Sequence, residues 1–88
     1  MQLAQVVIQN KVGMHARSAA MFVETANRFQ SEILVKRDEI AVNGKSIMGI
    51  MMLAAAKGVE LSVQATGSDE AEALQALIDL VNNKFGED

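Results

Sequence analysis

The chain contains no cysteine, proline, tryptophan or tyrosine, and its only aromatic side chains belong to three phenylalanines. Without cysteine it can form neither disulfides nor thiolate metal sites. No apolar run approaches the roughly 20 residues that a membrane-spanning helix needs, and no signal peptide is recognisable at the N-terminus. The eight basic residues are scattered and the net charge is −3, so no nucleic-acid partner is expected. These absences favour a soluble, cytoplasmic protein that does not insert into membranes.

The apolar content is sufficient for one packed domain. Half of the 88 residues are hydrophobic, and with so few aromatic residues the core must be filled by Ala, Val, Ile, Leu and Met. A chain of this length has no room for a second core. We therefore expect residues 1–88 to form a single domain.

The spacing of apolar residues predicts seven elements. Apolar residues alternate with polar ones in 59–66, as in a strand with one buried face, whereas Ala19, Phe22, Val23 and Ala26 recur with helical spacing. Strands are expected at 3–9, 32–37, 40–42 and 59–66, and helices at 16–28, from Ser46 to Lys57-Gly58, and from Ser68 or Asp69 onward.

This order, β-α-β-β-α-β-α, predicts an α/β (α+β) fold, an open-faced β-sandwich. Its four-stranded antiparallel sheet would have strand order 1-4-2-3 and three helices on one face. Two helix starts carry capping signals: Ser46 as an N-cap, and a D-x-x-E box formed by Asp69 and Glu72.

The stretch GMHARSAA contains the only histidine, His15, at the start of the first helix. The N–H groups of Ala16, Arg17 and Ser18 form an anion cradle there, because a helix N-terminus has unpaired donors. The same donors disfavour a protonated ring, which keeps a nitrogen free as a nucleophile. Arg17 adds a cation suited to phosphate. A histidine at such a junction is more often a simple cap, but this combination predicts a residue that accepts and passes on a phosphoryl group.

Other phosphoryl-transfer machinery is missing from the sequence. There is no Gly-rich phosphate loop and no carboxylate cluster for magnesium, so the chain would need one enzyme to load it and another to unload it. One histidine without cysteine makes a poor metal site. We expect no metal, no cofactor and no enzymatic turnover.

GMHARSAA together with NGKSIMGIMMLAAAKG resembles the HPr family, the histidine-containing phosphocarriers of the bacterial sugar phosphotransferase system. The resemblance extends over the whole chain. It implies that His15 is phosphorylated on Nδ1 and that Arg17 stabilises the phosphoryl group. It also implies phosphoenolpyruvate as the ultimate donor by way of enzyme I, enzyme IIA domains as acceptors, and a monomeric carrier.

The second motif implies regulation and docking. By the resemblance, Ser46 is phosphorylated by an HPr kinase/phosphorylase, with a catabolite-control transcription factor as a further partner. From the residues alone, Ser46 could be only an N-cap. The resemblance also implies a docking patch for partners, formed by Met48 and Met51 with Ile47, Met21 and Ala20. Met52 is expected in the core.

Ser18 departs from the family motif, which usually has proline at that position. Either its extra donors hold the phosphoryl group and slow transfer, or a looser first turn weakens the site. An alternative function also remains: a regulatory interaction module in nitrogen-type or catabolite-control signalling, with little role in sugar transport. The segments NKVGMHAR and NNKFGED resemble that nitrogen branch.

Overall fold

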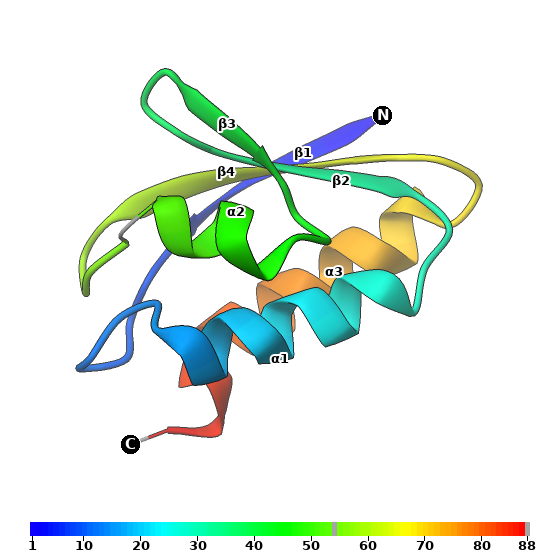
Figure 1. Ribbon diagram of the computed structural model, residues 1–88. Helices are drawn as coiled ribbons and strands as arrows, with labels where there is room; N and C mark the ends of the chain where they lie inside the picture. Colours follow the sequence, from blue (N-terminus) through cyan, green and yellow to red (C-terminus); the bar gives the residue numbers. More distant parts are fainter. Residues whose placement is uncertain (54, 88) are drawn as a thin grey trace.

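The computed structural model describes residues 1–53 and 55–87, in which the strands and helices follow one another in the predicted order (Figure 1). The elements are β1 (Gln2–Val7), α1 (Ala16–Asn27), β2 (Glu32–Arg37), β3 (Ile40–Asn43), α2 (Ile47–Met52), β4 (Glu60–Thr66), α3 (Glu70–Asn82) and a 3₁₀ turn, η1 (Lys84–Gly86). None of the helices in this described part is long and apolar enough to cross a membrane.

The four strands form one antiparallel sheet in the order β1-β4-β2-β3. Val63 in the central strand β4 is paired with Ala4 of β1 on one side and Val35 of β2 on the other. The helices lie on one face of this sheet and leave the other face open (Figure 1). The predicted open-faced sandwich and its strand order are confirmed.

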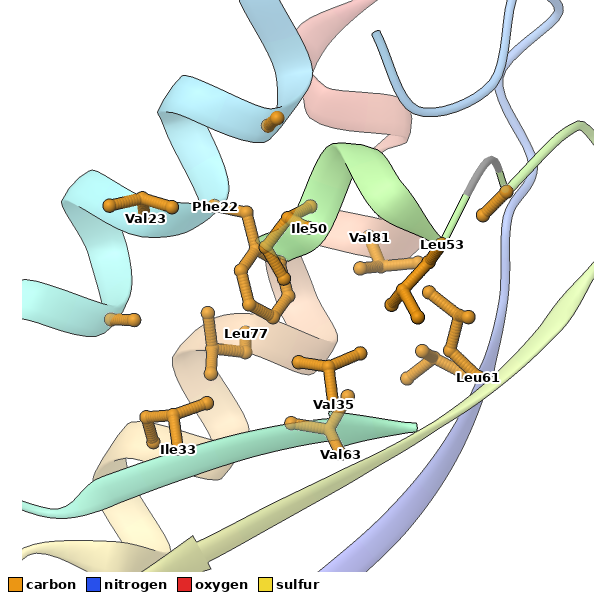
Figure 2. Packing of buried hydrophobic residues seen from close by; sticks show 14 of the residues in the cluster. Phe22, Val23, Ile33, Val35, Ile50, Leu53, Leu61, Val63, Leu77 and Val81 are labelled. Atoms are coloured by element: carbon orange, nitrogen blue, oxygen red, sulfur yellow. The ribbon is translucent and has the colours of Figure 1, made fainter. Parts of the chain in front are cut away.

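The core lies between the sheet and the helices. Alternate residues of β4 are buried, as are the four apolar residues predicted to face inward from α1. Figure 2 shows Phe22 of α1, Ile50 of α2 and Leu77 of α3 above Val35 and Val63 of the sheet. All five are fully buried, so the core holds α1, α2 and α3 against the sheet.

Helix α2 is shorter than predicted. It ends at Met52 rather than at Lys57-Gly58, and Ala54, which we expected inside it, lies outside the described residues. The chain after α2 binds the segment before α1 instead: Met14 N–H donates to the Ala55 carbonyl (2.7 Å) and Gly58 N–H to the Ile8 carbonyl (2.8 Å). Alanine favours a helix, but the Ala55 carbonyl points toward Met14 and so cannot accept from an N–H of its own helix. The long-range hydrogen bonds therefore end α2 early.

The predicted capping box of the last helix is wrong. Helix α3 begins at Glu70, and Asp69 makes no side-chain capping bond. Its carboxylate instead accepts hydrogen bonds from Gln30 N–H (2.9 Å), Ser31 N–H (3.0 Å) and the Ser31 hydroxyl (2.5 Å). The Ser31 hydroxyl first, and then Gln30 N–H, lower the pKa of Asp69. This residue therefore ties the connection between α1 and β2 to the start of α3.

Candidate functional site

His15 is the N-cap of α1, with an extended backbone and a side chain that is 35% exposed. Its carbonyl accepts the first intrahelical bond, from Ala19 N–H (2.8 Å). The N–H groups of Ala16, Arg17 and Ser18 precede that bond and have no partner within the helix. Arg17 N–H donates to His15 Nδ1 (3.3 Å), so this ring nitrogen faces the predicted anion cradle.

The loop before His15 is held by a close backbone contact. Gly13 has φ +70, and a Cβ atom there would lie 2.6 Å from the Ala55 carbonyl oxygen and 2.8 Å from Ala56 Cα. Only glycine satisfies both the left-handed backbone and this approach. The short end of α2 thus serves the site, because residues 55–56 form the surface against which the loop packs.

Ser18, which replaces the usual proline, is buried and bonded to this loop. Its hydroxyl accepts from His15 N–H (2.9 Å) and lies within donating distance of the Gly13 carbonyl (3.3 Å) and the His15 carbonyl (3.2 Å). The Ser18 N–H completes a capping box with the His15 side chain. The hydroxyl therefore binds the first turn of α1 to the loop.

Two residues of the site were not predicted from the sequence. Glu87 Oε2 lies 2.7 Å from His15 Nε2, and the buried Asn10 donates from Nδ2 to Glu87 Oε1 (2.9 Å). They are separated from each other by 77 positions and Glu87 from His15 by 72, so no local pattern could have paired them. The turn that follows α3 brings the C-terminal segment near the start of α1 (Figure 1), where Glu87 contacts His15.

The hydrogen bonds select one form of the neutral imidazole. The Asn10 amide first, and then the His15 ring, lower the pKa of Glu87, so its carboxylate is ionised at neutral pH and can only accept. Nε2 must then carry the ring proton, while Nδ1 accepts from Arg17 N–H through its lone pair. Both contacts require the same neutral tautomer, in which Nδ1 is unprotonated and Nε2 carries the proton.

Arg17 supplies positive charge at the mouth of the site. Its side chain is exposed, and its charge also lowers the pKa of Glu87. Among residues 1–53 and 55–87, none accepts a hydrogen bond from its guanidinium. That group can therefore turn toward an anion bound beside His15.

With His15 placed at the start of α1, the chain can be compared with known proteins. The family described as "PTS HPr component phosphorylation site" matches residues 3–83. The chain is also 55% identical over 80 residues to the phosphocarrier protein HPr of Neisseria meningitidis, which covers 91% of this chain and 90% of that protein. The chain belongs to the HPr family.

Other members of the HPr family agree in sequence and structure. The crystal structure of HPr-C-His from Thermoanaerobacter tengcongensis matches with a TM-score of 0.96 at 50% identity, over 100% of this chain and 99% of that one. The HPr-like protein Crh of Halalkalibacterium halodurans is 46% identical over 80 residues, 91% of this chain and 95% of that protein. Membership of the HPr family makes this chain a phosphocarrier of the phosphotransferase system.

The second HPr motif places Ser46 at the N-cap of α2, where its hydroxyl accepts from Gly49 N–H (3.1 Å). Of the predicted docking patch, Met48 is 77% exposed, Ile47 and Met51 are also exposed, and Ala20 and Met21 on α1 are half-buried.

The expectation that Met52 lies in the core is wrong, because its side chain is 70% exposed. Helix α2 has only six residues and buries one of them, Ile50, so its other apolar side chains stay at the surface.

Proposed function

We propose that this HPr-family protein accepts a phosphoryl group on His15 Nδ1 from phosphorylated enzyme I and passes it to enzyme IIA domains. Phosphoenolpyruvate would be the ultimate donor, and the chain would be a stoichiometric carrier rather than an enzyme. The observation that carries the proposal is the pair of hydrogen bonds on His15, which leaves the Nδ1 lone pair beside the first-turn N–H groups of α1.

The remaining residues of the cradle supply the electrostatics. Phosphoryl transfer depends mainly on positioning and on charge stabilisation of the phosphoryl oxygens. The N–H groups of Ala16, Arg17 and Ser18 would donate to those oxygens, and the Arg17 guanidinium would neutralise part of their charge. No metal ligand is needed for this scheme.

The test is intact-protein mass after incubation with enzyme I, magnesium and phosphoenolpyruvate, with His15→Ala as the matched variant. We expect the natural protein to gain one acid-labile phosphoryl group and His15→Ala to gain none. A folded natural protein that gains no phosphoryl group from an enzyme I active on another HPr would contradict the proposal. That result would favour the regulatory interaction module instead.

We further propose that Ser46 is a regulatory phosphorylation site for an HPr kinase/phosphorylase. Ser46 is half-buried at the start of α2, directly before the exposed Ile47 and Met48. A phosphate there adds nearly two negative charges, which a helix N-terminus tolerates. Inhibition would therefore act on docking rather than by unfolding. Titrating enzyme I with Ser46→Asp should show weaker binding at an unchanged unfolding midpoint, and equal binding would contradict this role.

We also propose that Met48 and Met51, with Ile47, Met21 and Ala20, form the docking patch for enzyme I and enzyme IIA domains. Exposed methionine adapts to several partners because its side chain is flexible and polarisable. Met48→Lys should weaken binding of both partners, whereas Met52→Lys, at an equally exposed position outside the predicted patch, is the control. Equal loss in the two variants would argue against this assignment.

A further inference from the structure

Methionine is concentrated in helix α2. Three of the six methionines of the chain, Met48, Met51 and Met52, lie within its six residues. Met48 is 77% exposed, Met52 is 70% exposed, and Met51 is exposed as well. Residues three and four apart share one side of a helix, so the three thioethers form one exposed group, the α2 methionine cluster. Methionine is among the residue types most often fully buried, which makes such a cluster unusual.

The α2 methionine cluster contributes little to the core. Helix α2 buries only Ile50, and in the described part of the chain no methionine is among the fully buried residues of the core. Met14 and Met21 are different, because they are half-buried and pack against that core. A polar group added to the cluster would therefore change the surface of α2 and leave the fold intact.

The amino-acid composition directs oxidation to methionine. The chain contains no cysteine, so it lacks the thiolates that peroxides oxidise most readily, and it contains neither tryptophan nor tyrosine. Methionine sulfur is then the next group to react. A peroxide has to reach the sulfur lone pair, so the exposed thioethers of α2 should react before the half-buried ones of Met14 and Met21.

We propose that Met48 and Met51 are oxidation sites at which a peroxide reversibly weakens the docking of enzyme I and enzyme IIA domains. The proposal rests on the proposed docking patch. The sulfur lone pair attacks one oxygen of hydrogen peroxide, so that an S–O bond forms while the O–O bond breaks. The other oxygen leaves as water and takes both hydrogens. The thioether is thereby oxidised to a sulfoxide and the peroxide is reduced to water.

The sulfoxide weakens docking because it makes an adaptable apolar contact polar. A partner that covers Met48 or Met51 would bury the S–O group, which costs free energy unless the partner supplies a donor. His15 is not altered, so the chemistry of phosphoryl uptake remains. Methionine sulfoxide reductases reverse the change: the sulfoxide oxygen leaves as water while a dithiol is oxidised to a disulfide.

The first experiment measures the order of oxidation. The natural protein is exposed to hydrogen peroxide for increasing times, and peptide mapping by mass spectrometry follows each methionine. We expect Met48 and Met52 to be oxidised first, Met51 next, and Met14 and Met21 last. The midpoint of urea unfolding should stay unchanged while only the α2 methionine cluster is oxidised. Oxidation of Met14 or Met21 before Met48 would overturn the proposal.

The second experiment measures loading by enzyme I and phosphoenolpyruvate after the peroxide has been removed with catalase. We expect KM of the oxidised natural protein to rise about tenfold, as for one interface side chain that contributes to binding, with kcat unchanged. The double variant Met48→Leu/Met51→Leu keeps the patch apolar at similar volume and should retain its KM after peroxide. Met52→Leu removes a comparably exposed sulfur outside the patch and should lose as much as the natural protein. Sulfoxide reductases should restore KM.

The outcomes separate this proposal from the carrier function. An unchanged KM with Met48 and Met51 fully oxidised would overturn the proposal and leave the carrier function intact. An equal rise of KM in the double variant would also overturn it, because the loss would then come from another site. If the unoxidised protein takes up no phosphoryl group, the carrier function fails, and calorimetric titration with enzyme I tests docking alone. Weaker binding after oxidation would then support the proposal, whereas equal binding, or no binding by either form, would overturn it.

Discussion

Helices α1 and α2 both begin at a polar side chain that accepts a hydrogen bond from its own first turn. Arg17 N–H donates to His15 Nδ1, and Gly49 N–H donates to the Ser46 hydroxyl. The local chemistry of the two caps is alike, and both are proposed phosphorylation sites.

Their surroundings differ. His15 is also bonded through its second nitrogen to Glu87, and the loop before it is packed on the segment after α2. Among the described residues, the hydrogen bonds of Ser46 stay within four residues along the chain. Distant segments therefore fix the orientation of His15, whereas Ser46 is held by its neighbours along the chain.

The largest effect on the α1 site is expected for a substitution at Gly13. We expect Gly13→Ala to lower the free energy of unfolding by about 3 kcal/mol, because a Cβ atom there adds left-handed strain and a clash with residues 55–56. Phosphoryl uptake should fall as well, since the loop carries His15. Urea unfolding and rapid-quench loading measure the two effects.

Gly58→Ala is the matched control for that substitution. Gly58 also has positive φ (+91), but nothing lies within 4 Å of its Cβ position. It should lose only about 1 kcal/mol, from backbone strain alone. If the two variants lost equal stability, the close contact between the loop and residues 55–56 would not hold the α1 site.

The second prediction tests the α2 cap. Ser46→Ala should lower the free energy of unfolding by about 1 kcal/mol, the usual loss for an N-cap, because Gly49 N–H then has no side-chain acceptor. Ser46→Asp should keep most of the stability, since aspartate caps as well as serine. Urea titrations of the two variants measure the difference, and equal values would show that the cap does not stabilise α2.

The same contrast between local and distant contacts decides what could be predicted from the sequence. Alternation in β4 and the helical spacing of Phe22 and Val23 are local signals, and they led to the correct strand order and core. His15 and Arg17 share one short motif, so their proximity was predictable. The two wrong predictions depend on contacts between segments far apart in the sequence. Helix α2 ends early because Ala55 binds the loop before α1, and Asp69 binds Ser31 instead of capping its own helix.

Glu87 and Asn10 are the clearest omission. Both lie in segments that resemble the family, but nothing in those segments predicts that the two side chains meet, because their contact depends on the left-handed turn at Lys84 and Phe85. The only available signal was a carboxylate near the chain's end and an asparagine next to the strand that leads to His15. Such pairs can be found only once the fold brings the segments together.

Acid should disturb the α1 site while leaving the α2 cap intact, because serine does not titrate. The pKa of Glu87 lies below its ordinary 4.5, so the contact with Asn10 and His15 stabilises the fold fully above that pH. This stabilisation is lost as the pH falls through the lowered pKa. Carbon-13 NMR titration of the carboxyl groups measures the midpoint.

Two variants test which hydrogen bonds lower the pKa values of Glu87 and Asp69. Asn10→Ala should raise the midpoint of Glu87, because the amide is the largest cause of its lowered pKa. Ser31→Ala should raise that of Asp69 and leave Glu87 unchanged. A Glu87 midpoint that did not respond to Asn10→Ala would contradict the hydrogen bond between them.

The smallest effect is expected for Ser18→Pro. Losing the hydroxyl that accepts from His15 N–H costs about 1 kcal/mol, losing the Ser18 N–H that bonds the His15 side chain costs a similar amount, and the restriction of the unfolded chain by proline returns roughly 0.4–1 kcal/mol. The free energy of unfolding should therefore fall by no more than about 1 kcal/mol. Amide hydrogen exchange at His15 should accelerate, because its acceptor is gone. Ser46 N–H, bonded to the Asn43 carbonyl, serves as the internal control and should exchange as before. Unchanged exchange at His15 would mean that the loop alone, without Ser18, closes the first turn of α1.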